Sequence, residues 1–146
     1  MSARSATLVV ILCGAVLSGI ADRAAADEML GTTVASKRNR DFAVLLSTTS
    51  DRLRAGDNPI CVEFQGVNNR IPTVDKVLAI EFRQLVGRME GSPIRAEMSP
   101  QRANRYCGTV HLGRQYYNPA NYYVFVRYTD TLGKKRVIRL HASIQE

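Results

Sequence analysis

The chain has 146 residues and a formal net charge of +7, from 20 Lys and Arg against 13 Asp and Glu. This length is enough for one domain. The basic balance favours association with anionic surfaces such as membranes, cell-wall polymers or acidic proteins, although it can also simply keep a protein soluble. After Ala26 no apolar run is long enough to span a membrane, which excludes a multi-span membrane protein.

The N-terminal segment 1–26 predicts a secretory signal peptide. Arg4 gives a basic start, Leu8–Ile20 is an apolar run too short for a spanning helix, and Ala24–Ala26 supplies small residues for cleavage. An uncleaved N-terminal anchor is the alternative. A lipoprotein is rejected because a large residue precedes Cys13. Cleavage near Ala26 would release a soluble periplasmic protein, and export argues against nucleic acid as a partner.

Two regions follow the predicted signal peptide. Residues 27–41 are polar, with Lys37, Arg38 and Arg40 clustered, and this composition predicts a flexible segment. Residues 42–146 contain short runs in which apolar and polar residues alternate, which indicates strands with one buried face. The runs before the terminal hairpin begin at Phe42, Ile60, Val77, Ile94 and Tyr106.

The third of these predicted strands runs from Val77 to Leu85, with Leu78, Ile80 and Phe82 expected on one face. A short fourth strand is expected from Ile94 to Met98. Residues 99–104 are expected to form a loop.

The clearest local signal is a hairpin from Asn121 to Ile144. Its first arm is apolar on both faces, which predicts a central strand. The second arm alternates from Val137 onward, which predicts a half-exposed neighbour. The connection begins with Asp130 and ends with Gly133, which suits a tight turn because Gly accepts a positive φ. Seven short strands then predict an all-β, immunoglobulin-like antiparallel sandwich, with a small closed barrel as the alternative.

Export also bears on the cysteines. Cys13 would leave with the signal peptide, so Cys61 and Cys107 form an even pair in an oxidising compartment. They lie on the second and fifth strands, which are neighbours in one sheet of the seven-strand sandwich, and both fall in the outward phase. We therefore expect a cross-strand disulfide worth about 4 kcal/mol. A redox-active or metal-binding pair is the competing interpretation, but the chain has no Cys-x-x-Cys.

No catalytic signature is present, and the chain is predicted to be non-enzymatic and without a cofactor. His111 and His141 fall at outward strand positions, where a surface role needs no chemistry. Copper binding through Met89 with either histidine is an alternative, because thioether and imidazole groups suit that metal. Met98 falls in the inward phase and is expected to pack in the core.

Tyrosines gather around the loop 113–121. Tyr116 and Tyr117 lie within it, Tyr122 follows it, and Arg114 lies beside them. Tyr and Arg are frequent at the energetic centres of interfaces, so these four residues form a candidate partner-binding patch. The alternative is that Tyr122 and its neighbour are strand residues and that the other rings cover the edge of the sandwich.

The region from Phe42 to Ser143 resembles the YtkA-like and FixH-like family of small exported β-sandwich domains. The resemblance is carried by Leu53–Asn58, Gly87–Gly91, Arg105-Tyr106 and Asn121–Val124. It implies an accessory protein of metal handling or respiratory-enzyme assembly, usually without catalytic activity. The chain departs from the family pattern in having no Trp and only one Met in the loop before the fourth strand.

These observations lead to one main hypothesis. The chain is expected to be a periplasmic, non-enzymatic accessory protein that binds a periplasmic or membrane-associated protein partner, with assembly of a redox or metal enzyme as the expected context. A periplasmic copper-binding protein and a small secreted enzyme inhibitor that uses the tyrosine loop are the alternatives.

Overall fold

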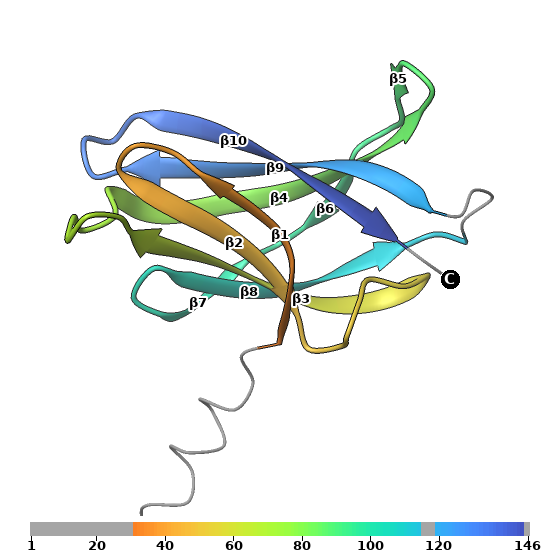
Figure 1. The fold of residues 1–146 in the computed structure, drawn as a ribbon, viewed down its shortest axis with the longest axis horizontal. Helices are drawn as coiled ribbons and strands as arrows, with labels where there is room; N and C mark the ends of the chain where they lie inside the picture. Colours follow the sequence, from red (N-terminus) through yellow and green to blue (C-terminus); the bar gives the residue numbers. More distant parts are fainter. Residues whose placement is uncertain (1–30, 115–118, 145–146) are drawn as a thin grey trace, which may run out of the picture.

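The computed structural model describes residues 31–114 and 119–144, and these residues form strands, turns and loops without a helix (Figure 1). The described strands are arranged as two facing antiparallel sheets. In chain order they are β1 (Thr32–Arg38), β2 (Phe42–Thr48), β3 (Gly56–Gly66), β4 (Val74–Val86), β5 (Met89–Glu90), β6 (Ile94–Ala96), β7 (Ser99–Arg102), β8 (Arg105–Leu112), β9 (Ala120–Asp130) and β10 (Lys135–Ile144).

The strand order defines the architecture. The first sheet is β1-β2-β3-β8-β7, and the second is β10-β9-β4-β5, with β6 also paired to β4. The orders β2-β3-β8-β7 and β4-β9-β10 are those of the four-strand and three-strand sheets of a constant-type immunoglobulin domain. The predicted immunoglobulin-like sandwich is therefore confirmed, and β1, β5 and β6 are additions to it.

The core lies between the sheets because alternate side chains of each long strand point inward. Leu46, Val62, Ile80 and Val124 have at most a trace of exposed surface, and burying each such side chain contributes about 1.5–3 kcal/mol. Every described strand and the whole buried core lie between residues 32 and 144. A chain that begins at Asp27 therefore keeps the complete described fold.

The terminal hairpin has the predicted form. β9 lies between β10 and β4, so it is central, and β10 has a half-exposed pattern. The Asp130 carboxylate accepts hydrogen bonds from the backbone N–H of Leu132 at 3.0 Å and of Lys134 at 2.9 Å. Gly133 has a φ of 75°, the conformation for which glycine was expected.

Three predictions about secondary structure are wrong. Residues 32–38 of the segment expected to be flexible form strand β1, and Ser99–Arg102, within an expected loop, forms strand β7. Both are edge strands with few buried side chains, so neither shows an apolar period of two. Leu78 is 37% exposed rather than inward, because a register shift between Val77 and Ala79 changes the phase of β4.

Candidate recognition surface on the second sheet

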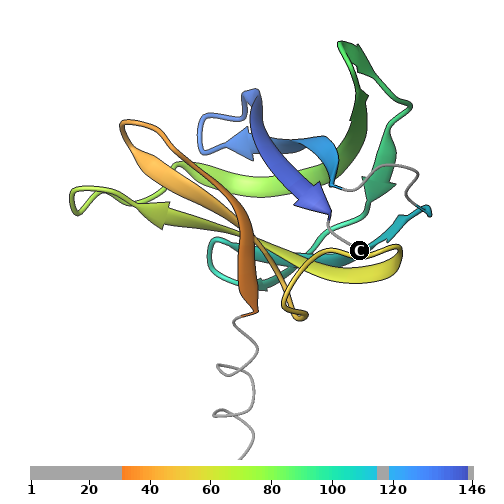
Figure 2. The same cartoon turned by 45° about the vertical axis from the view of Figure 1, so that its right-hand side comes forward.

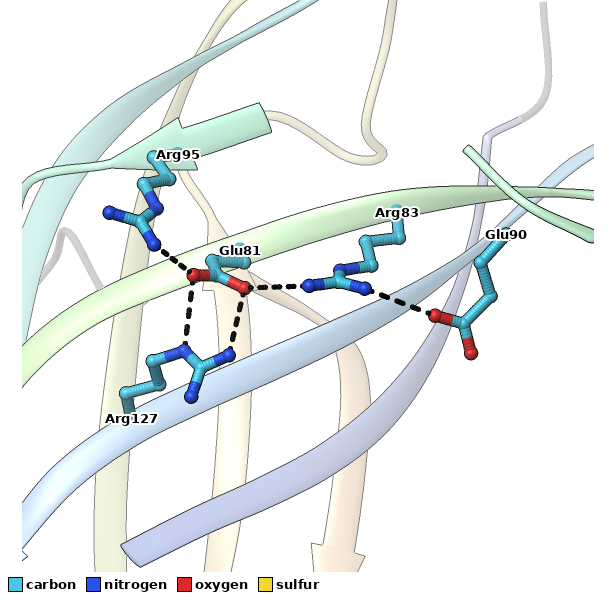
Figure 3. A network of polar contacts seen from close by, with 5 residues as sticks. All are labelled: Glu81, Arg83, Glu90, Arg95 and Arg127. Atoms are coloured by element: carbon cyan, nitrogen blue, oxygen red, sulfur yellow. Dashed lines mark hydrogen bonds and ion pairs between the residues drawn. The ribbon is translucent and has the colours of Figure 1, made fainter. Parts of the chain in front are cut away.

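A buried carboxylate organises the outer face of the second sheet. The Glu81 side chain on β4 is 1% exposed, and three arginines surround it (Figure 3). Arg127 on β9 makes a two-point contact, with Nε 3.1 Å from Oε1 and Nη2 3.2 Å from Oε2. Arg95 on β6 places Nη2 2.8 Å from Oε1. This fork geometry is the strong form of an Arg–carboxylate pair.

The strand register explains why these groups meet. Glu81 is directly opposite Arg95 on β6, while Arg127 is opposite Ala79, two positions before Glu81 on β4. Side chains two positions apart on a strand share a face, so Arg83 also points outward beside Glu81. The strands β4, β6 and β9 thus each contribute one arginine to the Glu81 carboxylate.

The arginines keep Glu81 ionised although it is buried. The hydrogen bond from Arg127 is the largest influence, burial opposes it, and Arg95 adds to it, so the pKa of the Glu81 carboxyl lies below its ordinary value of 4.5. Glu81 and the neighbouring Glu90 together cancel two of the three positive charges, so the cluster keeps a net charge of +1.

Arg83 has the longest ionic contacts of the three. Its Nη2 lies 3.5 Å from Glu81 Oε2 and its Nη1 lies 3.5 Å from Glu90 Oε2, so both ionic contacts are long (Figure 3). The Arg83 Nε is buried and has no hydrogen-bond partner among the described residues. The guanidinium lies over the ring of Phe125, 5.2 Å from its centroid. The side chain is therefore positioned by the aromatic ring as well as by the two carboxylates.

Half-buried aromatic rings complete the face. Tyr123 and Phe125 on β9 have their centroids 6.4 Å apart in an edge arrangement, and His141 lies beside Tyr123 at 6.2 Å. The Arg139 guanidinium lies over the Tyr123 ring at 4.5 Å, within the range of a cation–π contact. We call this surface the arginine face, and it consists of Arg83, Arg95, Arg127, Arg139, Tyr123 and Phe125 around Glu81.

The structure describes only part of the predicted tyrosine patch. Arg114 is exposed, as expected. Tyr116 and Tyr117 lie outside the described residues, so their predicted role stays a prediction. The prediction that Tyr122 binds a partner is wrong. Tyr122 is 1% exposed, and its ring centroid lies 6.2 Å from that of Phe82. Its neighbour Tyr123 occupies the outward phase instead.

The two predicted cysteines meet as expected. Cys61 on β3 is directly opposite Cys107 on β8, with a Cα–Cα distance of 4.1 Å, and the sulfurs are bonded. Beside them, Glu63 contacts Arg102 at 3.3 Å and Arg105 at 3.1 Å. Burial raises the pKa of Glu63, but hydrogen bonds from Gln65 and the two arginines outweigh it, so the net direction is downward.

The candidate copper ligands are not brought together. His111 lies on β8 of the first sheet, where it contacts Asp57 at 2.7 Å, whereas His141 lies on β10 of the second. Met89 on β5 is 74% exposed, and three strand spacings, about 14 Å, separate β5 from β10. Met98 packs against the core, as predicted. Within the described residues, no three His, Cys, Asp or Glu side chains cluster as metal ligands.

The cluster around Glu81 was not predicted from the sequence. A signal was present, because Glu81 and Arg83 occupy the polar phase of a strand whose other phase is strongly apolar. That phase indicates an outward position, but the partners on β6 and β9 follow only from strand pairing.

Comparisons with protein-family models, curated proteins and solved structures found no match for this chain. Among the described residues there is no helix with the length and apolar character needed to cross a bilayer.

Proposed function

We propose that this protein is an exported, non-enzymatic binding module that captures an acidic partner protein on the arginine face. The observation that carries the proposal is a set of surface arginines on one sheet, three of them paired with the Glu81 carboxylate and a fourth lying over the half-buried Tyr123 ring. Arg and Tyr are enriched among the residues that dominate binding energy at protein interfaces. A carboxylate-rich partner would complement the excess positive charge.

The rigidity of the surface supports this role. The Arg127 guanidinium is fixed by two contacts to Glu81, and Arg139 is held over the Tyr123 ring. A partner would therefore find side chains whose rotamers are already restricted, which lowers the entropic cost of binding. Arg83, with its two long ionic contacts, can exchange one of them for a partner carboxylate.

Export is part of the proposal. It is supported by the basic start, apolar run and small residues of the N-terminal segment 1–26, and by a disulfide, which persists in oxidising compartments. The resemblance to the YtkA-like and FixH-like family supports a partner that is a periplasmic or membrane-associated enzyme under assembly.

The test is capture of the partner by a tagged protein from periplasmic extract, quantified by mass spectrometry. The Arg83→Met, Arg139→Met double variant should capture the partner about tenfold less well, which corresponds to roughly 1.4 kcal/mol. The matched control is the Arg52→Met, Arg54→Met double variant, which removes the same charge from the β2–β3 loop, where Arg54 pairs with Asp51. Equal losses in both variants would show non-specific charge attraction, and undiminished capture by the first variant would exclude the arginine face.

A further inference from the structure

Three connections meet at one end of the sandwich, opposite the end where β8 finishes and β9 begins. They are the β1–β2 turn, the loop 67–73 between β3 and β4, and the turn 131–134 between β9 and β10 (Figures 1 and 2). The Val67 N–H donates to the Asp41 carbonyl at 3.2 Å, and the Thr131 N–H donates to the Thr73 carbonyl at 3.3 Å. Backbone hydrogen bonds therefore hold the three connections against one another.

Two aliphatic side chains project from these connections. Ile71 is 83% exposed and Leu132 is 78% exposed, the two largest values among the exposed large hydrophobic residues of the described chain. The backbone is restricted at both positions, because Pro72 follows Ile71 and the Leu132 N–H donates a hydrogen bond to the Asp130 carboxylate. Isolated exposed aliphatic residues are ordinary, but here two occupy neighbouring loop tips that a backbone hydrogen bond links.

The same end is strongly basic. Residues 37–41, 70–76 and 130–136 contain eight Lys and Arg against three Asp. Arg70 pairs with Asp41 and Arg136 pairs with Asp130. The remaining cations are exposed and have no ion pair among the described residues; they are Lys37, Arg38, Arg40, Lys76, Lys134 and Lys135. We call this region, with Ile71 and Leu132, the basic end.

We propose that the basic end docks on an anionic lipid surface, with Ile71 and Leu132 inserted at the level of the headgroups. Stable attachment to a membrane surface generally needs two signals, and a polybasic patch combined with apolar insertion supplies both. A fluid bilayer accepts projecting aliphatic side chains without a matching pocket. An acidic protein would need such pockets at both loop tips, so the combination favours lipid.

Docking in this way leaves the arginine face accessible. Thr129 of β9 is paired with Lys135 at the basic end, and Tyr123 lies six positions away along the strand, at a distance of about 20 Å. The basic end would hold the molecule at a membrane surface, and the arginine face would stand above that surface. The lipid proposal concerns different residues from the proposed function, so each can fail alone.

The first test is co-sedimentation of residues 27–146 with vesicles. Wild-type protein should bind phosphatidylcholine vesicles that contain phosphatidylglycerol and should bind pure phosphatidylcholine vesicles much less. The Ile71→Ser, Leu132→Ser variant should bind the anionic vesicles about tenfold less well, because it loses the insertion. The matched control, Val86→Ser with Met89→Ser, changes two exposed apolar residues near β5 and should bind like the wild type.

A second test reports insertion directly. The chain contains no Trp, so Leu132→Trp introduces a single indole whose emission should shift to shorter wavelength on anionic vesicles. Met89→Trp should show no shift. The proposal is overturned if wild-type protein fails to bind anionic vesicles, if the two serine variants bind equally, or if the Leu132→Trp emission does not move. A wild-type affinity that is the same for neutral vesicles would also overturn it.

Discussion

The outer faces of the two sheets differ in the contacts that join their strands. On the first sheet, the Cys61–Cys107 disulfide joins β3 to β8, and the Glu63 side chain beside it is 21% exposed. On the second sheet, Glu81 joins β4 to β6 and β9 through arginines and is 1% exposed. The first sheet also has an ionic contact, from Glu63 on β3 to Arg102 on β7 and Arg105 on β8, but that carboxylate is the more exposed of the two. The Glu81 cluster has three arginines beside two half-buried aromatic rings, which makes the second face the better candidate for recognition.

The largest expected effect on the unfolding free energy comes from removing the Cys61–Cys107 disulfide. The Cys61→Ala, Cys107→Ala variant should lose about 4 kcal/mol of unfolding free energy, because reopening a loop with a sequence separation of 46 restores entropy to the unfolded chain. Urea denaturation of oxidised protein and variant measures the difference. An unchanged urea midpoint would mean that the disulfide contributes nothing to the stability of the first sheet.

Removing the Glu81 carboxylate should lower the unfolding free energy somewhat less than removing the disulfide does. Glu81→Gln keeps the shape of the side chain but leaves Arg83, Arg95 and Arg127 without their shared anion, and we expect a loss of about 3 kcal/mol. Urea denaturation again provides the measurement. Glu63→Gln is the matched control on the first sheet, and it should cost about 1 kcal/mol because that pair is more solvated. Equal losses would remove the distinction between the two faces.

Acid should weaken the ionic cluster selectively. The pKa of Glu81 is lowered in the folded state, chiefly by its hydrogen bond from Arg127, so its stabilising contribution is present above the ordinary value of 4.5. That contribution is lost as the pH falls through the lowered pKa. Thermal unfolding of wild-type protein and Glu81→Gln should therefore differ most at neutral pH, and the difference should shrink as the pH falls below 4.5 and disappear below the lowered pKa. Curves that stay parallel down to low pH would contradict the ionised state of Glu81.

The sequence predicted the strand phases well where alternation is regular. The outward phases of Cys61 and Cys107 were enough to place the disulfide, because β3 and β8 keep an uninterrupted register. Along β9, Tyr123 lies on the same face as the charged Arg127, which indicates the outer face, and Tyr122 lies on the opposite face. The alternation alone therefore could have predicted that Tyr122 is buried.

Other features depend on pairing that a single strand does not reveal. The register shift between Val77 and Ala79 in β4 moves Leu78 out of the inward phase, and a register shift in β1 interrupts any simple period there. The arginine face requires side chains of β4, β6, β9 and β10, from Glu81 to Arg139, to be aligned by the sheet although they lie far apart along the chain. No local spacing in the sequence encodes that alignment.

The smallest expected effect is the difference in coupling energy between one surface contact on each sheet. The Arg139 guanidinium lies 4.5 Å from the Tyr123 ring centroid, and a double-mutant cycle with Arg139→Met and Tyr123→Leu should give a coupling energy of about 0.5 kcal/mol. On the first sheet, Asp57 and His111 are 75% and 73% exposed, so the cycle with Asp57→Asn and His111→Gln should give about 0.2 kcal/mol or less at neutral pH. Urea denaturation of all the single and double variants provides both values. A larger coupling for the exposed pair on the first sheet would reverse the comparison, because it would show that the arginine face is not the more strongly pre-organised surface.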